Sequence, residues 1–259
     1  MSARDSRGLF GDALKGMASF AAMILIWEAI AISGMVQKGL VPSPMQTLER
    51  FVHLFRTAGL SYDIAISTLR VVVGVLVGAS LAIPVGFCLG WYKGVRPFVD
   101  PLINFFRALP PIALIPLVIV YFGIGEFAKI SLLMYAAFFA SVIVMYEGIR
   151  SLNPTYIRVA QALGASEFEI FTKVIVPASL PHALTALRVA VGISWTTLVA
   201  AELVAAHRGL GAVIVSGQDY FQVSTIYVGI ILIGAIALLM DNAFRLLSRR
   251  LVSWQTTIR

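Results

Sequence analysis

Apolar stretches that approach 20 residues recur along nearly the whole of this 259-residue sequence. An α-helix needs about 20 apolar residues to cross the ~30 Å hydrocarbon layer of a bilayer. The pattern therefore predicts an all-α integral membrane protein rather than one or two soluble domains.

The overall composition supports this prediction. Apolar residues make up 59% of the chain and charged residues 13%, against about 25% charged in an average soluble domain. Such a chain has too little polar surface to cover itself in water. The first apolar segment begins near Gly16 and lacks a small-residue cleavage site, so we expect it to be a retained span.

Six spans are expected, and six spans place both termini on one side of the membrane. Twelve Lys and Arg residues fall on the side of the termini and five on the other. Positively charged residues near span ends are retained in the cytoplasm, so we expect cytoplasmic N- and C-termini. The net charge of +7 then reflects topology, not a nucleic-acid surface. The expected spans are 17–36, 64–91, 98–122, 130–149, 182–204 and 223–246.

These spans divide the chain into three parts. A cytoplasmic N-terminal segment covers 1–16, a transmembrane domain covers 17–246, and a cytoplasmic tail covers 247–259. Within the transmembrane domain, residues 150–181 form a cytoplasmic loop.

The third expected span contains Arg107, Pro110, Pro111 and Pro116. Proline removes a backbone donor and kinks a helix, and such breaks are tolerated at membrane depth where protein or a water-filled cavity covers them. We therefore expect a broken span. It is either a wall of a transport pathway or a packing kink.

Polar residues within spans are costly, so each is a candidate functional position. Arg70 and Arg188 lie nearer span ends and are expected to snorkel towards the interface. Glu202 is interpreted as a gate or a helix-packing partner. The pathway candidates are Arg107, Pro110, Pro111, Trp195, Thr197 and Glu202.

The loop between the fourth and fifth spans carries consistent helix signals. Asn153 and Pro154 form a helix start, and Gly164 is placed to end that helix. Ser166 and Glu169 have the spacing of a capping box that opens a second helix, which Pro177 is expected to stop. The loop is thus predicted to be helix, glycine turn, helix.

The first loop helix carries an apolar stripe. Tyr156, Val159, Ala160 and Leu163 recur at i, i+3, i+4 and i+7, which places them on one face. A short amphipathic helix outside the bilayer must bury that face. It either lies on the membrane surface or its own span ends, or it docks into a groove of a cytoplasmic partner.

The stretch AQALGASEFEIFTKVIVPASLP, Ala160 to Pro181, resembles the signature loop of permease subunits of binding-protein-dependent ATP-binding-cassette (ABC) importers. That signature is Glu-Ala-Ala, three residues, Gly, nine residues, Ile-x-Leu-Pro. Gly164 and Pro177 match it, and Val174 and Val176 are conservative replacements. Arg158-Val159-Ala160 stands in place of Glu-Ala-Ala. The acidic contact to the ATPase that the family signature implies is therefore not expected in this chain.

The resemblance covers almost the whole chain. It includes VPSP (41–44), ALPPIALIPLVIVYFGIG (108–125) and TLVAAELVAAHRGLG (197–211). These segments resemble the branch that imports taurine, aliphatic sulfonates, nitrate and related anions, and the last one most resembles taurine-type permeases.

The resemblance implies the type I ABC importer permease fold in a bacterial inner membrane and a substrate such as taurine or another sulfonate. It also implies a second copy of the chain, two cytoplasmic ATPase subunits and a periplasmic or lipid-anchored binding protein. Residues expected to couple to the ATPase are Tyr156, Arg158, Val159, Ala160, Leu163, Gly164, Ala165, Ser166 and Pro177. Residues expected to contact the binding protein are His207, Arg208, Gly209 and Gly211.

Catalysis is not expected in this chain. The dipeptide Gly-Lys is absent from the sequence, so there is no phosphate-binding GxxxxGK[ST] loop, and ATP and Mg²⁺ belong to the partner ATPase. The three histidines are scattered, without HExxH or paired cysteines for a metal or another cofactor.

An autonomous ion-driven carrier and an intramembrane enzyme are the alternative functional classes for this chain. Nitrate, bicarbonate, cyanate, aromatic acids and vitamin precursors are the alternative substrates.

Overall fold

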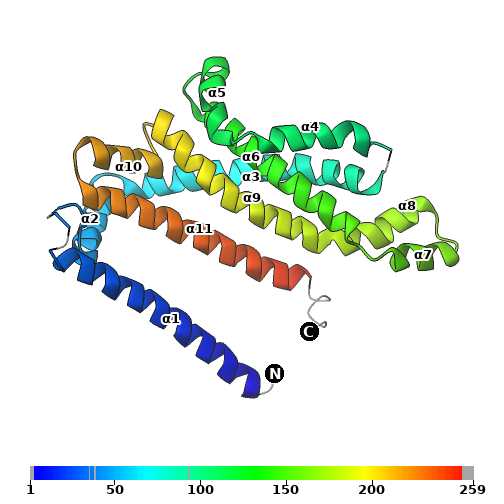
Figure 1. Ribbon diagram of the computed structural model, residues 1–259, viewed down its shortest axis with the longest axis horizontal. Coiled ribbons are helices and arrows are strands. Elements are labelled where there is room, and N and C mark those ends of the chain that lie inside the picture. Colours follow the sequence, from blue (N-terminus) through cyan, green and yellow to red (C-terminus); the bar gives the residue numbers. More distant parts are fainter. Residues whose placement is uncertain (1–2, 35, 38, 93, 253–259) are drawn as a thin grey trace. The chain divides into compact units, whose positions relative to one another are not determined.

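A computed structural model describes residues 3–34, 36–37, 39–92 and 94–252, so the outermost parts of the two expected terminal segments, 1–2 and 253–259, lie outside it. Every regular element in the described residues is helical, which confirms the all-α prediction (Figure 1). In order they are α1 (Ala3–Ile32), α2 (Pro44–Thr57), α3 (Leu60–Trp91), α4 (Arg96–Ala108), the 3₁₀ turn η1 (Pro111–Leu114), α5 (Ile115–Phe122), α6 (Glu126–Arg150), α7 (Pro154–Ala162), α8 (Glu167–Ile170), the π turn η2 (Phe171–Ile175), α9 (Val176–Ala205), α10 (Leu210–Asp219) and α11 (Val223–Leu251).

The predicted spans are confirmed in the described part of the chain. Five helical segments there are long and apolar enough to cross a membrane, and a bent pair makes a sixth. The five are Lys15–Ile32, Leu60–Trp91, Glu126–Arg150, Glu167–Val204 and Val223–Ser248. The fifth predicted span began at 182, and the helix in fact begins at 167.

The predicted stop at Pro177 is wrong, and the π turn explains why. Helix runs without interruption from Glu167 to Ala205. The Val176 amide donates to the Phe171 carbonyl, a five-residue step that widens the helix just before the proline. A π bulge of this kind accommodates a change of register within a continuous helix. Pro177 directly follows this turn as the second residue of α9, so its ring lies where the wider turn has already shifted the hydrogen-bond register.

The third span is broken, as predicted from its prolines. Arg96–Ala108 and Pro111–Phe122 meet at an angle of 84°. Pro110 is extended (ψ 130°), and Pro111 lies in the first turn of η1. Pro116 lies in the first turn of α5. Proline is tolerated at such first-turn positions because no helical amide bond is lost there.

The chain forms two compact units: Met1–Ser61 with Val213–Ile231, and Tyr62–Ala212 with Leu232–Arg259. In the first unit, the Trp27 ring stacks on Tyr227 with centroids 5.6 Å apart, and Arg50 Nε donates to Thr225 Oγ1 over 2.8 Å. In the second unit, α6 packs along α9 (Figure 1). The second unit contains the loop and the charged residues considered below.

Glycines bring α3 close to α6 within the second unit. Gly74 with Gly78, and Gly86 with Gly90, are four residues apart, so each pair shares one face of α3, and all four lie against residues of α6. A Cβ on Gly74 would lie 2.4 Å from the Leu133 Cβ atom. Small residues at this spacing let helices approach closely in a membrane. The sequence analysis did not use this pattern, although the spacing was visible.

We expect Gly78→Ala to destabilise the protein, because its Cβ would lie 2.5 Å from the Met134 carbonyl oxygen, a backbone atom that cannot rotate away. Overpacking of this kind costs about 1–3 kcal/mol. Gly192→Ala in α9 is the matched control, since nothing lies within 4 Å of its Cβ position. Denaturant unfolding in detergent should show a lower free energy of unfolding for Gly78→Ala and an unchanged value for Gly192→Ala. Equal behaviour of both variants would contradict the close packing.

Candidate functional site

The loop between α6 and α9 has the predicted helix–turn–helix structure. Asn153 Oδ1 accepts the Thr155 amide over 2.9 Å at the start of α7. Ser166 and Glu169 form the predicted capping box: the Glu169 amide donates to Ser166 Oγ over 3.3 Å, and the Ser166 amide donates to Glu169 Oε2 over 3.1 Å. Both helix starts are therefore fixed by local hydrogen bonds.

Gly164 ends α7 in the left-handed conformation, with φ +81°. The Ala165 amide donates to the Ala160 carbonyl over 3.0 Å, and the Gly164 amide donates to the Gln161 carbonyl over 2.9 Å. This pair of bonds is a Schellman motif, which favours glycine because its central residue has positive φ. The turn therefore sets the direction in which α8 leaves α7.

Helix α7 has one buried edge and one exposed apolar face. Ile157 and Ala160 pack with Ala165 against a core cluster of Met145, Ile149, Ile170 and Ile175. The exposed face is formed by Tyr156 (58% exposed), Val159 (53%) and Leu163 (83%). Ala160, predicted within the stripe, thus lies at its buried margin. The other three do not pack on the chain's own span ends.

The remaining loop residues of the sequence prediction differ in exposure. Arg158 and Pro177 are exposed, and Ala165 is half-buried. Ser166 is engaged in the capping box. The structure thus places the predicted coupling residues on one connected segment of helix, turn and helix.

A buried ion network lies in the second unit, in a different group of residues. Arg70 is 2% exposed and Glu202 1%, and their side chains form an ion pair of 2.5 Å. Arg70 also pairs with Glu126 over 2.5 Å, and Glu126 accepts from Lys129 over 3.1 Å. The expectation that Arg70 snorkels to the interface is therefore wrong, because carboxylates of α6 and α9 hold its guanidinium inside the protein.

The segment after α9 is tied to this network through three consecutive backbone amides. Gly209, Leu210 and Gly211 donate respectively to Asp63 Oδ1 (2.9 Å), Ser67 Oγ (2.9 Å) and Glu202 Oε2 (2.7 Å). The N-terminus of α10 therefore faces carboxylates, which its dipole favours.

The four residues predicted to contact a binding protein have two different environments. Gly209 and Gly211 are buried, and a Cβ on Gly211 would lie 2.4 Å from the Glu202 Cβ atom. His207 and Arg208 are exposed, and the Arg208 guanidinium lies 5.9 Å from the centre of the Tyr62 ring. They border a cavity of about 340 Å³ that Arg70, Glu126 and Lys129 also line.

The predicted pathway residues are not brought together within one chain. Arg107 and Pro110 are exposed at the bend of the third span, and Pro111 is half-buried. Trp195 is 3% exposed and donates to Met240 Sδ over 3.3 Å. Thr197 is 5% exposed and donates to the Ile193 carbonyl over 3.0 Å.

Ion pairs also join three further ionisable residues of the spans. Arg188 pairs with Asp241, which also accepts from Arg245 over 2.9 Å. No group of three or more His, Cys, Asp or Glu residues that could hold a metal ion occurs in the described part of the chain.

Comparisons with known proteins agree with this arrangement. Residues 74–253 match the family model described as "Binding-protein-dependent transport system inner membrane component". A probable ABC transporter permease protein of Brucella abortus (strain 2308) is 43% identical, over 92% of this chain and 94% of its own length. The taurine transport system permease protein TauC of Escherichia coli (strain K12) is 37% identical, over 93% and 90%. The putative aliphatic sulfonates transport permease protein SsuC of Bacillus subtilis (strain 168) is 33% identical, over 94% and 88%.

Solved structures show the same fold at lower identity. An inward-facing structure of the MetNI methionine ABC transporter aligns with a TM-score of 0.67 at 21% identity, over 74% of this chain and 96% of that chain. The predicted type I importer permease fold is confirmed by this similarity.

Proposed function

Because this chain belongs to the family of binding-protein-dependent transport system inner membrane components, we propose that it forms the translocation channel of an ATP-driven importer for taurine or another small sulfonate. The chain is a multi-pass, non-catalytic permease subunit of the inner membrane. Hydrolysis of ATP therefore requires a partner subunit.

The observation that carries the coupling proposal is the exposed apolar face of α7. Tyr156, Val159 and Leu163 lie on a helix whose two ends are fixed by the Asn153 cap and the Gly164 turn. A rigid short helix with an uncovered apolar face is suited to a groove on a partner. We assign that groove to the ATPase, with Arg158, Gly164, Ala165, Ser166 and Pro177 supporting the docked helix. Closure of the ATPase dimer would move α7 and, through α8 and the π turn, α9.

The proposed complex contains two copies of this chain, two ATPase subunits and a binding protein. The membrane domain covers 17–246, and its loop 150–181 faces the cytoplasm. The terminal segments 1–16 and 247–259 face the cytoplasm as well. The binding protein contacts His207 and Arg208 on the opposite side, where Gly209 and Gly211 hold the segment against Glu202.

The proposed pathway passes the bend of the third span. Arg107, Pro110 and Pro111 lie at that bend, and an arginine offers positive potential to an anion. Trp195, Thr197 and Glu202 are buried along α9, and their burial fixes the helix that borders the pathway.

The sulfonate assignment rests on relatives named for taurine and aliphatic sulfonates. A bicarbonate transport system permease protein, CmpB of Synechococcus elongatus, is 31% identical. If the substrate is bicarbonate, nitrate, an aromatic acid or a vitamin precursor, this chain would have the same role in an ABC importer, together with a different binding protein.

Reconstitution tests the proposal. Proteoliposomes that contain this chain, its ATPase and its binding protein should accumulate labelled taurine only when ATP is supplied, and vesicles with this chain alone should not. Accumulation by the chain alone under an ion gradient would instead indicate an autonomous carrier. The ligand that raises the melting temperature of the binding protein identifies the substrate, since a ligand that binds only the folded form stabilises it.

A further inference from the structure

A cavity of about 700 Å³ lies on the inner side of the α7 loop, where α3 and α6 end and α4, α7 and α8 begin. Its wall includes Trp91 at the end of α3, Arg96 at the start of α4, and Arg150 at the end of α6. Each of these residues is also the limit of an apolar segment. We place the cavity near the polar headgroups, because Trp91, Arg96 and Arg150 lie within two residues of the ends of the expected spans 64–91, 98–122 and 130–149.

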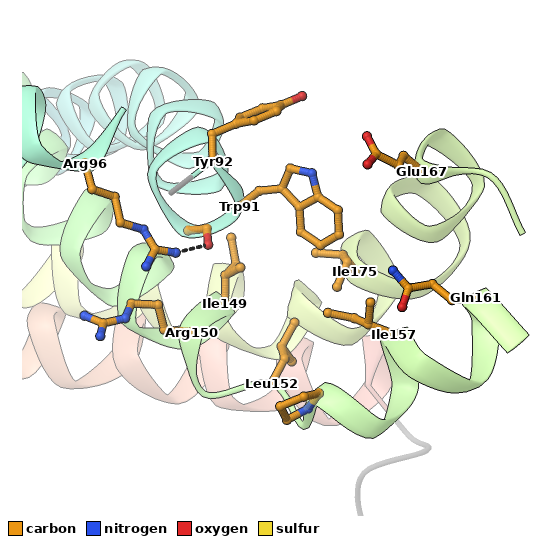
Figure 2. Close-up of a pocket in the computed structure, with 12 residues that line it drawn as sticks. Trp91, Tyr92, Arg96, Ile149, Arg150, Leu152, Ile157, Gln161, Glu167 and Ile175 are labelled. Atoms are coloured by element: carbon orange, nitrogen blue, oxygen red, sulfur yellow. Dashed lines mark hydrogen bonds between the residues drawn. The ribbon is translucent and has the colours of Figure 1, made fainter. Parts of the chain in front are cut away.

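Figure 2 shows that the two cations of this cavity lie apart from its other polar side chains. Arg96 and Arg150 lie on one wall, while Gln161 and Glu167 lie on the other. Arg96 Nε donates to the Leu89 carbonyl over 2.7 Å, and its guanidinium lies 5.6 Å from the centre of the Tyr146 ring. Arg150 approaches the same ring at 5.4 Å. Tyr146 thus brings two cations to one wall.

An apolar furrow adjoins this cavity. A second cavity, of about 430 Å³, shares Trp91, Tyr92 and Glu167 with the first and is otherwise lined by Phe87, Cys88, Phe168 and Phe171. The Phe171 ring meets Phe87 edge-on at 5.8 Å and Trp91 at 6.2 Å. The two cavities together offer a cationic pocket that continues into an aromatic groove.

We propose that this composite site binds an anionic phospholipid, with the phosphate at Arg96 and Arg150 and an acyl chain along Phe87 and Phe171. Basic pockets between spans bind anionic headgroups in this way. A headgroup that carries hydroxyls as well as a phosphate, such as that of phosphatidylglycerol, would also donate to Glu167 on the opposite wall. The site uses the inner side of the loop, not the exposed face of α7, so it does not depend on the ATPase assignment.

Trp91 provides a local probe, because brominated acyl chains quench a tryptophan that they contact. We would incorporate the full chain into phosphatidylcholine nanodiscs that contain a small fraction of brominated phosphatidylglycerol or brominated phosphatidylcholine. The difference in fluorescence between the unchanged protein and the Trp91→Phe variant isolates the contribution of Trp91. Brominated phosphatidylglycerol should quench it at a lower mole fraction than brominated phosphatidylcholine does.

Removal of one cation should weaken this selectivity. We define the half-quenching fraction as the mole fraction of brominated lipid that gives half of the maximal quenching. A charge near an anionic lipid surface contributes about 1 kcal/mol, so Arg150→Gln should raise the half-quenching fraction of phosphatidylglycerol roughly fivefold. Arg158→Gln is the matched control, because Arg158 is also exposed at this loop and is not a lining residue of either cavity. It should leave the half-quenching fraction unchanged. Equal unfolding midpoints in detergent would show that both variants fold.

Four results would overturn the proposal. Equal quenching by the two brominated lipids would mean an unselective lipid shell, and an equal shift in Arg158→Gln would mean diffuse surface charge. Recovery of the fluorescence on addition of inorganic phosphate would mean a site for a small anion rather than a lipid. The complete complex should retain the quenching, and its loss when the ATPase binds would assign the cavity to the ATPase. None of these results bears on ATP-dependent uptake, so they leave the proposed function to its own test.

Discussion

Replacing Leu163 by Asp should reduce ATP-driven uptake by at least about tenfold while the protein stays folded in the membrane. Leu163 is 83% exposed in the chain itself, so an aspartate there costs little stability before a partner binds. In the proposed ATPase groove, burial of a leucine side chain contributes about 1.5–3 kcal/mol, and tenfold corresponds to 1.4 kcal/mol. A buried carboxylate adds a desolvation cost.

The matched control is Ala162→Asp. Ala162 is exposed on the same helix and lies about 100° round the axis from Leu163. An aspartate at position 162 therefore adds the same charge away from Leu163. The assay measures labelled substrate uptake and ATPase copurification in the same membranes. If both variants lose uptake equally, charge at the loop and not the apolar face is responsible. If Leu163→Asp transports normally, α7 does not dock through this face.

A substitution in the buried ion network should have the largest effect on stability. Glu202→Leu removes the carboxylate that accepts from Arg70 Nη1 (2.5 Å), Ser67 Oγ (2.8 Å) and the Gly211 amide (2.7 Å). Removal of one partner of a buried ion pair costs about 3–5 kcal/mol, and here Arg70 would keep only the half-exposed Glu126 as its counter-charge. We expect this loss in the free energy of unfolding, measured by denaturant titration in detergent micelles.

Two further variants make this result interpretable. Glu147→Leu in α6 makes the same chemical change at an exposed position and should be far less destabilising. The double variant Arg70→Met/Glu202→Leu removes both charges of the pair and leaves Glu126 with Lys129, so it should lose less than the sum of the two single variants. A Glu202→Leu loss no larger than that of Glu147→Leu would show that the buried pair contributes little.

Local signals predicted the loop well because they act within a few residues. The Asn153 cap, the Gly164 turn and the Ser166–Glu169 capping box each satisfy backbone groups of their own helix end. The Pro177 prediction failed for a related reason. A proline removes one amide, but whether the helix stops depends on the preceding turn, and here a π turn absorbs the change.

The charged residues could not be placed from the sequence alone. Arg70 was expected to snorkel because it lies near a span end, yet Glu126 and Glu202 are 56 and 132 positions away in the chain and meet it in the structure. Gly209 and Gly211 were expected to contact a binding protein. Their roles within the chain depend on Asp63 and Glu202, which only the packing of α3 against α9 brings near.

The sequence by itself determined that the chain is helical and membrane-embedded, because the number of apolar residues in a row and the capping residues at each end are local properties. It also placed the spans, since hydrocarbon thickness fixes the length that each one needs. The tertiary structure decided which faces are covered. Burial and ion pairing depend on residues far apart in sequence, so only packing could leave Leu163 exposed, enclose Arg70 and form the cavity beside Arg96 and Arg150.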